Sequence, residues 1–250
     1  MASPAASSAA EPVPRIAPGV APLRAGQGRS FLLRRLHSLS GIFPVGAYLI
    51  EHMVSNAFAT KGPEAYGKQV AFLTSVPFLE VVEFTFIFLP ILFHAFYGFY
   101  IWHSGESNLA DYPWAGNWMY NAQRWTGAIA FAYIVFHTWE MRFTGVNLAE
   151  NPQAAFAKVQ TALQNPWVLA FYVVGIVAAV WHFSYGLWLF AAKWGITVGD
   201  RARRRFGRVC FVLALVFLAA WLWTVRAFLK TPVLRIAQQT AHSVAVETVR

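Results

Sequence analysis

Apolar stretches of roughly twenty residues recur along this chain and constrain its fold more than any other feature. A helix rises ~1.5 Å per residue, so each stretch is long enough to cross about 30 Å of hydrocarbon. The composition agrees, because 57% of the 250 residues are hydrophobic, 17% are aromatic and only 12% are charged. Such a composition is unlike that of a soluble domain. The sequence therefore predicts an all-α integral membrane protein.

We expect five transmembrane helices, which cover approximately residues 38–57, 79–102, 123–141, 167–188 and 206–228. Pro44 lies in the first turns of the first span, where a kink can accommodate it. Between the third and fourth spans, Phe156, Val159 and Leu163 share one helical face. That pattern is typical of a short helix that lies in the membrane interface.

This pattern divides the chain into an N-terminal tail (1–30), a membrane domain (31–230) and a C-terminal tail (231–250). The N-terminal tail is rich in Ala, Pro, Ser and Gly and has no apolar periodicity. We expect it to be flexible, because it cannot bury enough surface to become ordered. It contains no continuous apolar core, which disfavours a cleaved secretory signal.

The basic residues indicate the orientation of the chain in the membrane. Twelve of the twenty Lys and Arg residues lie before the first span or in and directly beside the loops after the second and fourth spans, including the run RARRRFGR at 201–208. The positive-inside rule then places the N-terminus on the cytoplasmic side of the membrane. We expect this membrane to be a bacterial inner membrane. The net charge of +9 does not indicate nucleic-acid binding, because these residues alternate with apolar spans and form no patch on a soluble domain.

Each of the first four predicted spans contains one histidine well inside its apolar stretch: His52, His94, His137 and His182. A polar side chain in hydrocarbon is costly without a partner, by ~2.5 to 3.5 kcal/mol for charged residues on insertion scales. His52 and His137 lie about 7 Å below the outer boundary, whereas His94 and His182 lie about 22 Å below it. The histidines therefore form two pairs, each at one depth.

Two imidazoles at one depth can occupy both axial positions of a haem iron, an arrangement suited to electron transfer. We expect two b-type haems in a bundle of the first four helices. His52 and His137 would bind the outer haem, and His94 and His182 the inner one. The single cysteine, Cys210, excludes a cysteine-ligated iron–sulfur cluster within the chain, and no CxxCH motif for covalent haem attachment occurs. A zinc or di-iron site is disfavoured because HxxH and HxxxH spacings are absent.

A weak internal repeat supports this interpretation. The motifs HAFYG (94–98) and HFSYG (182–186) each begin with one of these histidines and end in a glycine one turn later. The terminal glycines could let a flat macrocycle approach the helix backbone. Gly41 and Gly127 precede the other two histidines by about ten residues. The first two spans thus resemble the third and fourth.

Haem propionates require cationic or hydroxyl partners near water. The candidates that we select near the depth of the inner pair are Arg35, His37, Ser38 and Arg124. The alternative is that the arginines only anchor helix ends.

Two carboxylates lie close to the outer pair in the sequence. Glu51 directly precedes His52, and Glu140 follows His137 by one helical turn. Carboxylates at membrane depth are functional candidates, and these two could exchange protons with a quinone. The alternative is that they reach back to the interface as surface residues.

The sequence resembles the cytochrome b558 subunits of succinate dehydrogenase, the five-helix, di-haem anchors of complex II. The matching stretches are RRLHSLSGIFPVGAYLIEH, FLPILFHAFYGFYI, NWMYNAQRWTG, FHTWEMR and HFSYGLWLFAAKWGITV. The resemblance implies the same four haem ligands and the same pairing. It also implies a flavoprotein and an iron–sulfur subunit on the cytoplasmic face, and a menaquinone site near the outer haem. The two terminal tails depart from the family pattern.

The expected function is therefore electron transfer from succinate, through the iron–sulfur subunit and two haems, to menaquinone in the tricarboxylic acid cycle. Succinate itself would bind elsewhere in the complex, and only quinone chemistry would belong to this chain. Reverse flow, as in fumarate reductase, needs the same parts. The cytochrome b anchor of a hydrogenase or formate dehydrogenase is an alternative. A haem-free transporter, whose histidines only form hydrogen bonds between helices, is a more distant one.

Overall fold

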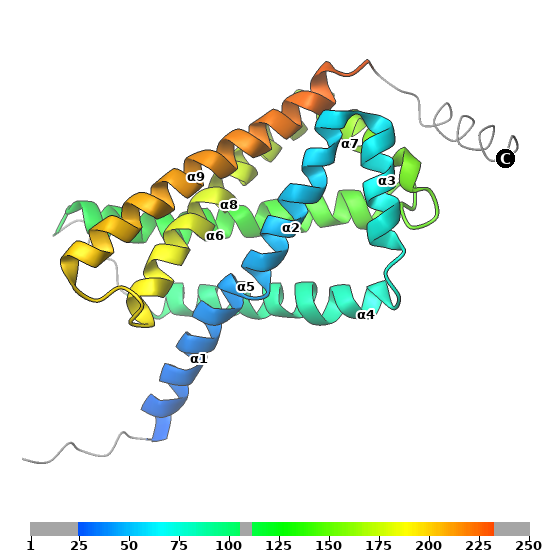
Figure 1. The fold of residues 1–250 in the computed structure, drawn as a ribbon. Helices are drawn as coiled ribbons and strands as arrows, with labels where there is room; N and C mark the ends of the chain where they lie inside the picture. Colours follow the sequence, from blue (N-terminus) through cyan, green and yellow to red (C-terminus); the bar gives the residue numbers. More distant parts are fainter. Residues whose placement is uncertain (1–24, 106–111, 233–250) are drawn as a thin grey trace, which may run out of the picture.

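The computed structural model describes residues 25–105 and 112–232, and all the regular structure in these ranges is helical (Figure 1). The α-helices are α1 (Ala25–Ile42), α2 (Val45–Ala57), α3 (Pro63–Thr74), α4 (Leu79–Glu83), α5 (Leu89–His103), α6 (Ala115–Thr138), α7 (Ala155–Leu163), α8 (Pro166–Lys193) and α9 (Gly199–Lys230). Helix α1 begins at Ala25, before the predicted end of the tail. The predicted tails at 1–24 and 233–250 lie outside the described residues.

Three helical segments are long and apolar enough to cross a membrane: Leu79–His103, Pro166–Lys193 and Gly199–Lys230. They correspond to the predicted second, fourth and fifth spans. The predicted first span is instead two helices, because α1 ends and α2 begins on either side of Phe43 and Pro44. The predicted third span lies in α6, whose first half carries polar residues that lower its mean hydropathy. The protein is thus a membrane protein with several helices, and the prediction that five helices cross the membrane stays a prediction.

The second span is interrupted by the π segment η2 (Phe84–Phe88) between α4 and α5. Pro90 lies two residues after this segment, in the first turn of α5, and because proline has no N–H it cannot complete the hydrogen bond of a regular α-helix. A second π segment, η3 (Trp139–Phe143), continues α6 beyond His137. It carries Glu140, one of the predicted carboxylates.

The bundle has two distinct ends (Figure 1). Helices α3 and α7 and the last turns of α9 gather at one end, which we call the α7 end. The connection between α8 and α9 lies at the other, the α8–α9 end. Within the bundle α6 packs against α8, α8 against α9, and α1 against α5. These contacts join helices within each half of the sequence, and contacts of α1 with α8, α2 with α9 and α5 with α6 join the two halves.

Helix α7 coincides with the predicted interfacial helix, but it is buried on several sides and does not expose a polar face. Phe156 is fully buried and Leu163 is 2% exposed, yet Lys158 and Gln160 are buried too. Helix α3, which was not predicted, covers α7 together with α8 and α9. Tyr66 of α3 packs edge-on against Phe156. The α7 end is therefore a packed core.

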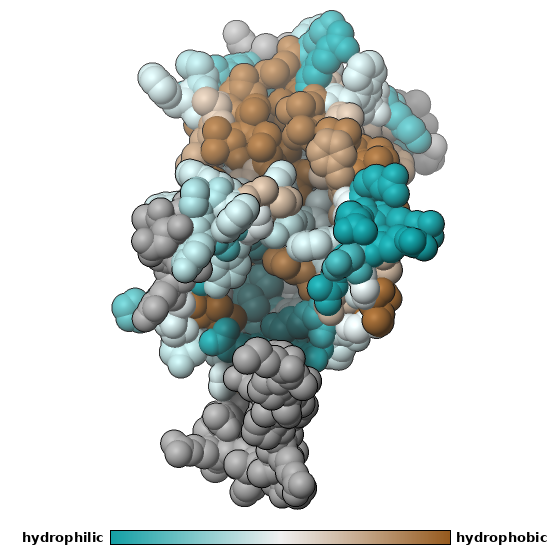
Figure 2. Space-filling model, turned by 90° about the vertical axis from the view of Figure 1, so that its left-hand side faces the viewer, coloured by the Kyte–Doolittle hydropathy of each residue, from teal (hydrophilic) through white to brown (hydrophobic). Residues whose placement is uncertain are grey.

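The outer surface of the bundle is strongly apolar. Along α9 the side chains of Phe211, Val212, Leu215 and Val216 are each more than half exposed. Figure 2 looks onto the α8–α9 end and shows hydrophobic residues across much of its upper part, with hydrophilic residues grouped beside them. A soluble monomer rarely exposes such surface, whereas lipid tails cover it in a membrane protein.

Candidate functional site

The four predicted histidines come from four different helices and meet in two pairs. The ring centroids of His52 (α2) and His137 (α6) lie 5.7 Å apart, with the ring planes at 71°. Those of His94 (α5) and His182 (α8) lie 6.0 Å apart, with the planes at 86°. These are the pairs that the depth of each histidine in its span predicts. We call them the outer pair and the inner pair.

Both spacings fit the axial ligands of one haem iron. An imidazole nitrogen bonds a transition metal at about 2 Å, so two imidazoles on opposite sides of one ion have their centres roughly 6 Å apart. No such fit is required of histidines that only form hydrogen bonds between helices. The donor chemistry also suits haem iron, which takes neutral imidazole nitrogens.

In the inner pair, each histidine is held by a backbone carbonyl of the neighbouring helix. The Nδ1 atom of His94 lies 3.0 Å from the carbonyl oxygen of His37. The Nδ1 atom of His182 lies 3.0 Å from the carbonyl oxygen of Gln123. Because a carbonyl only accepts, Nδ1 must carry the proton in both rings, which leaves Nε2 as the metal-binding nitrogen.

A hydroxyl one turn later in the same helix lies close to each of these carbonyls. Ser40 Oγ donates to the carbonyl of His37 at 3.0 Å. Thr126 Oγ1 lies 3.3 Å from the carbonyl oxygen of Gln123, but its shorter hydrogen bond, at 2.7 Å, is to the carbonyl of Ala122. In addition, the side-chain amide of Gln123 donates to the carbonyl of His182 at 3.0 Å. The inner pair is thus positioned chiefly by the backbone.

Two glycines allow the inner histidines to pack this closely. A Cβ atom on Gly127 would lie 2.7 Å from Cε1 of His182, and one on Gly41 would lie 2.9 Å from Nδ1 of His94. Separations below about 3 Å require something to shift. Residues with side chains at these positions would therefore displace the rings.

The glycines that end the repeated motifs lie next to side chains that the sequence did not indicate. A Cβ atom on Gly98 would lie 3.2 Å from the ring of His37, and one on Gly186 would lie 3.3 Å from the amide of Gln123. They make room for the side chains that position the ligands, and their contact with a macrocycle remains a prediction.

The internal repeat is therefore visible as repeated geometry. Helices α1 and α5 in the first half match α6 and α8 in the second. The equivalent residues are His37, Ser40, Gly41, His94 and Gly98 in one half, and Gln123, Thr126, Gly127, His182 and Gly186 in the other.

Two polar atoms beside the inner pair are buried without a hydrogen-bond partner in the described ranges, Nδ1 of His37 and Oε1 of Gln123. They occupy equivalent positions in the repeat. The ring of His37 also stacks on that of His94, with centroids 4.2 Å apart. Ser38 follows His37 on α1 and is half-buried. Of the four predicted propionate partners, His37 thus lies closest to a ligand.

The two predicted arginines make other contacts. Arg35 Nη1 donates to the carbonyl of Lys193 at 2.6 Å, and Lys193 Nζ donates to the carbonyl of Arg34 at 3.1 Å. These bonds join α1 to the last turn of α8. Arg124 donates to the hydroxyl of Tyr120 and lies over its ring. Their role toward propionates remains a prediction.

In the outer pair, side chains replace the backbone as partners. The Nδ1 atom of His137 lies 3.1 Å from the hydroxyl oxygen of Tyr172. That hydroxyl in turn donates to Oε2 of Glu140 at 3.1 Å. The amide of Asn56 lies 3.3 Å from Nε2 of His52. Tyr172 was not predicted, although it lies near the outer start of α8, at about the depth of the outer pair.

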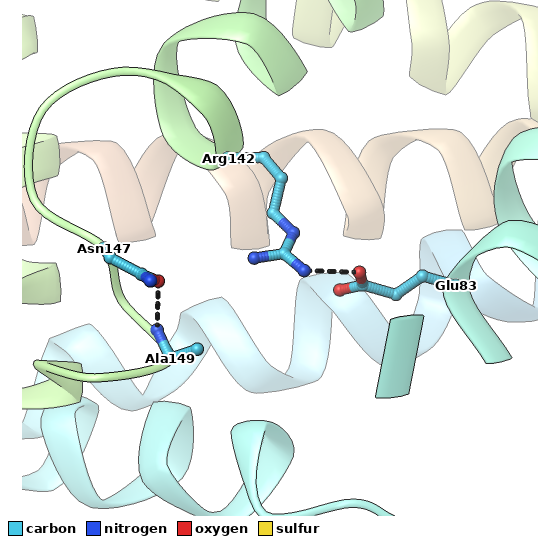
Figure 3. A network of polar contacts seen from close by, with 4 residues as sticks. All are labelled: Glu83, Arg142, Asn147 and Ala149. Atoms are coloured by element: carbon cyan, nitrogen blue, oxygen red, sulfur yellow. Dashed lines mark hydrogen bonds and ion pairs between the residues drawn. The ribbon is translucent and has the colours of Figure 1, made fainter. Parts of the chain in front are cut away.

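The remaining carboxylates lie in separate networks. Glu51 is exposed on α2 and accepts a 2.5 Å hydrogen bond from Ser55, which accepts one from Gln69 of α3. Glu83 of α4 forms a 3.0 Å ion pair with Arg142 of η3 (Figure 3). Glu51 and Glu140 therefore face different surroundings.

Lys158 of α7 stabilises the segment that carries Glu140. Its ammonium donates to the carbonyls of Met141, Thr144 and Val146 at 2.9, 2.6 and 2.9 Å. Burial lowers the pKa of Lys158, and attraction to Glu140 opposes that shift. The ammonium thus caps the end of η3, where unpaired carbonyls carry partial negative charge.

In the part of the chain that the structure describes, the fold and the site together define the class of this molecule: an all-helical membrane protein with two pairs of histidines between its helices. Residues 107–221 match the family of succinate dehydrogenase/fumarate reductase transmembrane subunits. The chain is also 43% identical over 176 residues to the succinate dehydrogenase cytochrome b558 subunit of Bacillus subtilis (strain 168). The aligned region covers 70% of this chain and 86% of that protein. The chain belongs to this family and is a membrane anchor of the succinate dehydrogenase and fumarate reductase type.

Proposed function

We propose that this chain is the di-haem anchor of a succinate dehydrogenase in a bacterial inner membrane, with its N-terminus in the cytoplasm. The observation that supports this most is the meeting of four intramembrane histidines in two pairs, 5.7 and 6.0 Å apart. Haem irons held there would supply one-electron transfer between an iron–sulfur subunit on the cytoplasmic side and menaquinone on the outer side.

The residues of the chain would set up this transfer by holding the ligands in place. In the inner pair, the carbonyls of His37 and Gln123 bind the Nδ1 protons, which orients both Nε2 atoms. The hydrogen bonds between Arg35 and Lys193 hold α1 against α8 at the same end. The inner pair would thus keep its geometry while a partner subunit docks.

The charge of the α8–α9 end supports its assignment to the cytoplasm. Arg201, Arg204, Arg205 and Arg208 line an open hollow of about 510 Å³ at the start of α9. Clustered arginines at the end of a span are typical of the cytoplasmic side. We propose that the flavoprotein and iron–sulfur subunits lie on this side.

A recess lined in part by α2, the helix that carries His52, supports a quinone site near the outer pair. It has a volume of about 320 Å³ and lies between α2, η1 (Phe58–Lys61) and α9. Its lining is mainly apolar and includes Met53, the neighbour of His52, with Thr60 and Lys61 as polar groups. A quinone needs such a mixture, an apolar wall and a few hydrogen-bond donors. Glu51 and Glu140 remain our candidates for proton exchange with it.

The proposal is tested by a reduced-minus-oxidised optical spectrum of the purified complex, combined with the haem content per chain. We expect a b-type band and two haems. His182→Ala should remove only the inner haem, and His137→Ala only the outer one. His103→Ala is the matched control, because His103 is exposed at the end of α5 and belongs to neither pair. A wild-type complex without a b-type band would overturn the proposal.

The direction of electron flow is a separate question, because the family includes subunits of succinate dehydrogenases and of fumarate reductases. We propose succinate oxidation, in keeping with the name of the relative from Bacillus subtilis. Assays of the complex with succinate and a menaquinone analogue, and with fumarate and the reduced analogue, compare the two directions. A complex that reduces fumarate much faster than it oxidises succinate would reverse the assignment.

A further inference from the structure

The partners of the four candidate ligands differ in kind between the two ends of the bundle. Both inner histidines donate Nδ1–H to a neutral backbone carbonyl. The hydroxyl of Ser40 also lies 3.4 Å from Nδ1 of His94, but it donates to a backbone carbonyl. The hydroxyl that lies 3.1 Å from Nδ1 of His137 instead donates to a carboxylate. One ligand of the four thus ends in a chain of side chains that leads to a negative charge.

We propose that Tyr172 is a positioning residue, which together with Glu140 orients His137 and makes it the most electron-donating of the four ligands. This inference rests on the proposed haem-binding function. The order of the hydrogen bonds follows from the donors. Because the hydroxyl of Tyr172 gives its proton to Glu140, its oxygen lone pairs are free to accept Nδ1–H of His137.

The surroundings of Tyr172 support a fixed geometry. Its side chain is only 5% exposed and belongs to the main core cluster. The rings of Phe136 and Tyr133 pack edge-on against it. A buried hydroxyl is destabilising unless it is hydrogen-bonded, and both hydrogen bonds of Tyr172 are present here.

The position of Glu140 is also fixed, as the proposed series of hydrogen bonds from His137 through Tyr172 to Glu140 requires. It lies in η3, and the three hydrogen bonds of Lys158 secure the carbonyls at the end of this segment. The Lys158 ammonium is a favourable neighbour for the carboxylate. A charged acceptor forms a stronger hydrogen bond than a neutral one. The pull on the Tyr172 proton, and through it on Nδ1–H, should therefore exceed that of a backbone carbonyl.

This difference should appear in the redox potential of the outer haem. A hydrogen bond from the far nitrogen of a metal-bound imidazole raises the basicity of the ligand. A more basic axial ligand favours the ferric iron and lowers the potential. Removal of the phenol hydroxyl should therefore raise the potential of the outer haem and leave that of the inner haem unchanged.

The test is a redox titration of the full complex, followed by its b-type absorption, for wild type and Tyr172→Phe. The His52→Ala variant should lack the outer haem, so the component of the titration curve that disappears in it belongs to the outer haem. The matched control is Tyr133→Phe. The ring of Tyr133 also stacks on that of His137, with centroids 5.6 Å apart, but no hydrogen bond joins the two in the described part of the chain. We expect the potential of the outer haem to be higher in Tyr172→Phe than in wild type, and unchanged in Tyr133→Phe.

A second variant covers the possibility that Tyr172→Phe binds no outer haem. Glu140→Gln keeps an oxygen that can accept the phenol proton but removes the charge, so it should raise the outer potential by a smaller amount. Unchanged potentials in Tyr172→Phe, or in Glu140→Gln where the first variant lacks the haem, would overturn the role of Tyr172. Equal shifts of both haems would do the same. A wild-type complex without haem would instead overturn the proposed function itself, and this inference with it.

Discussion

The inner and outer histidine pairs have almost the same spacing, but they are built by different means. The inner pair lies in a repeated frame of backbone carbonyls, hydroxyls and glycines from α1, α5, α6 and α8. The outer pair lies next to a core of side chains from α3, α7 and α9. One site is thus determined by close approach of helix backbones, and the other by buried side chains that surround it.

The difference teaches which changes each site can tolerate. A backbone carbonyl is present whatever side chain the residue carries, so the inner frame depends on glycines that let helices approach. The outer frame depends on the chemical identity of Tyr172, Glu140 and Lys158. Substitutions at glycines should therefore damage the inner pair, and substitutions at polar side chains the outer pair.

The largest effect that would test this comparison is expected from Gly127→Val. A Cβ at this position would lie within 2.7 Å of the His182 ring, so the branched side chain must displace it. Overpacking of this kind costs about 1 to 3 kcal/mol. We expect most of the inner haem to be lost and the outer haem to remain, as measured by haem content and by the two components of a redox titration.

Gly116→Val is the control, because a Cβ on Gly116, in the same helix α6, meets no atom within 4 Å. It should retain both haems. If Gly127→Val also retained both with unchanged potentials, the close approach of α6 to His182 would not matter for the inner site.

A second, smaller effect is expected from Lys158→Met. The substitution keeps the length of the side chain but leaves three carbonyls without their charged donor, at a cost of about 3 kcal/mol. Thermal denaturation in detergent should show a lower Tm, and the outer haem should dissociate before the inner one. Lys68→Met is the control, because Lys68 is 71% exposed and its ion pair contributes less than about 1 kcal/mol. Simultaneous loss of both haems would contradict the separation of the two sites.

The smallest effects are expected from Ser40→Ala and Thr126→Val, which sharpen the comparison from within the inner pair. Each removes a hydroxyl close to a carbonyl that holds a ligand. Loss of the Ser40 hydrogen bond costs about 0.5 to 1.5 kcal/mol. The effect of Thr126→Val should be smaller, because the shorter hydrogen bond of Thr126 is to the carbonyl of Ala122. Because the two positions are equivalent in the repeat, both variants should shift the inner potential in the same direction and leave the outer one in place. Opposite shifts would show that the repeated geometry is not a functional repeat.

The sequence allowed the histidine pairing to be predicted because an α-helix rises by a constant amount per residue. Depth in a membrane can therefore be counted along the chain, and His52 and His137 fall at one depth as His94 and His182 fall at another. The same argument could not find the partners of the rings. Whether His182 faces the carbonyl of Gln123 depends on how α6 and α8 are rotated against each other. The apolar pattern of one helix does not predict this rotation.

Three features illustrate the limit. The sequence did not indicate that Gly98 and Gly186 adjoin the side chains of His37 and Gln123. Helix α3 was not predicted, because it is short and only moderately apolar. Helix α7 was expected at the interface, but α3 covers it and turns it into a core element. In each case the deciding neighbour is distant in the sequence.

The amino-acid sequence alone thus determined the membrane class, most of the long helices and the pairing of the four histidines, because each depends on local composition or on the fixed rise of a helix. Only the tertiary structure decided that Tyr172 and Glu140 lie beside His137, that two backbone carbonyls hold the inner ligands, and that α7 is buried. These features arise where surfaces of separate helices meet. Their contacts depend on packing in three dimensions, which the order of residues along one helix does not reveal.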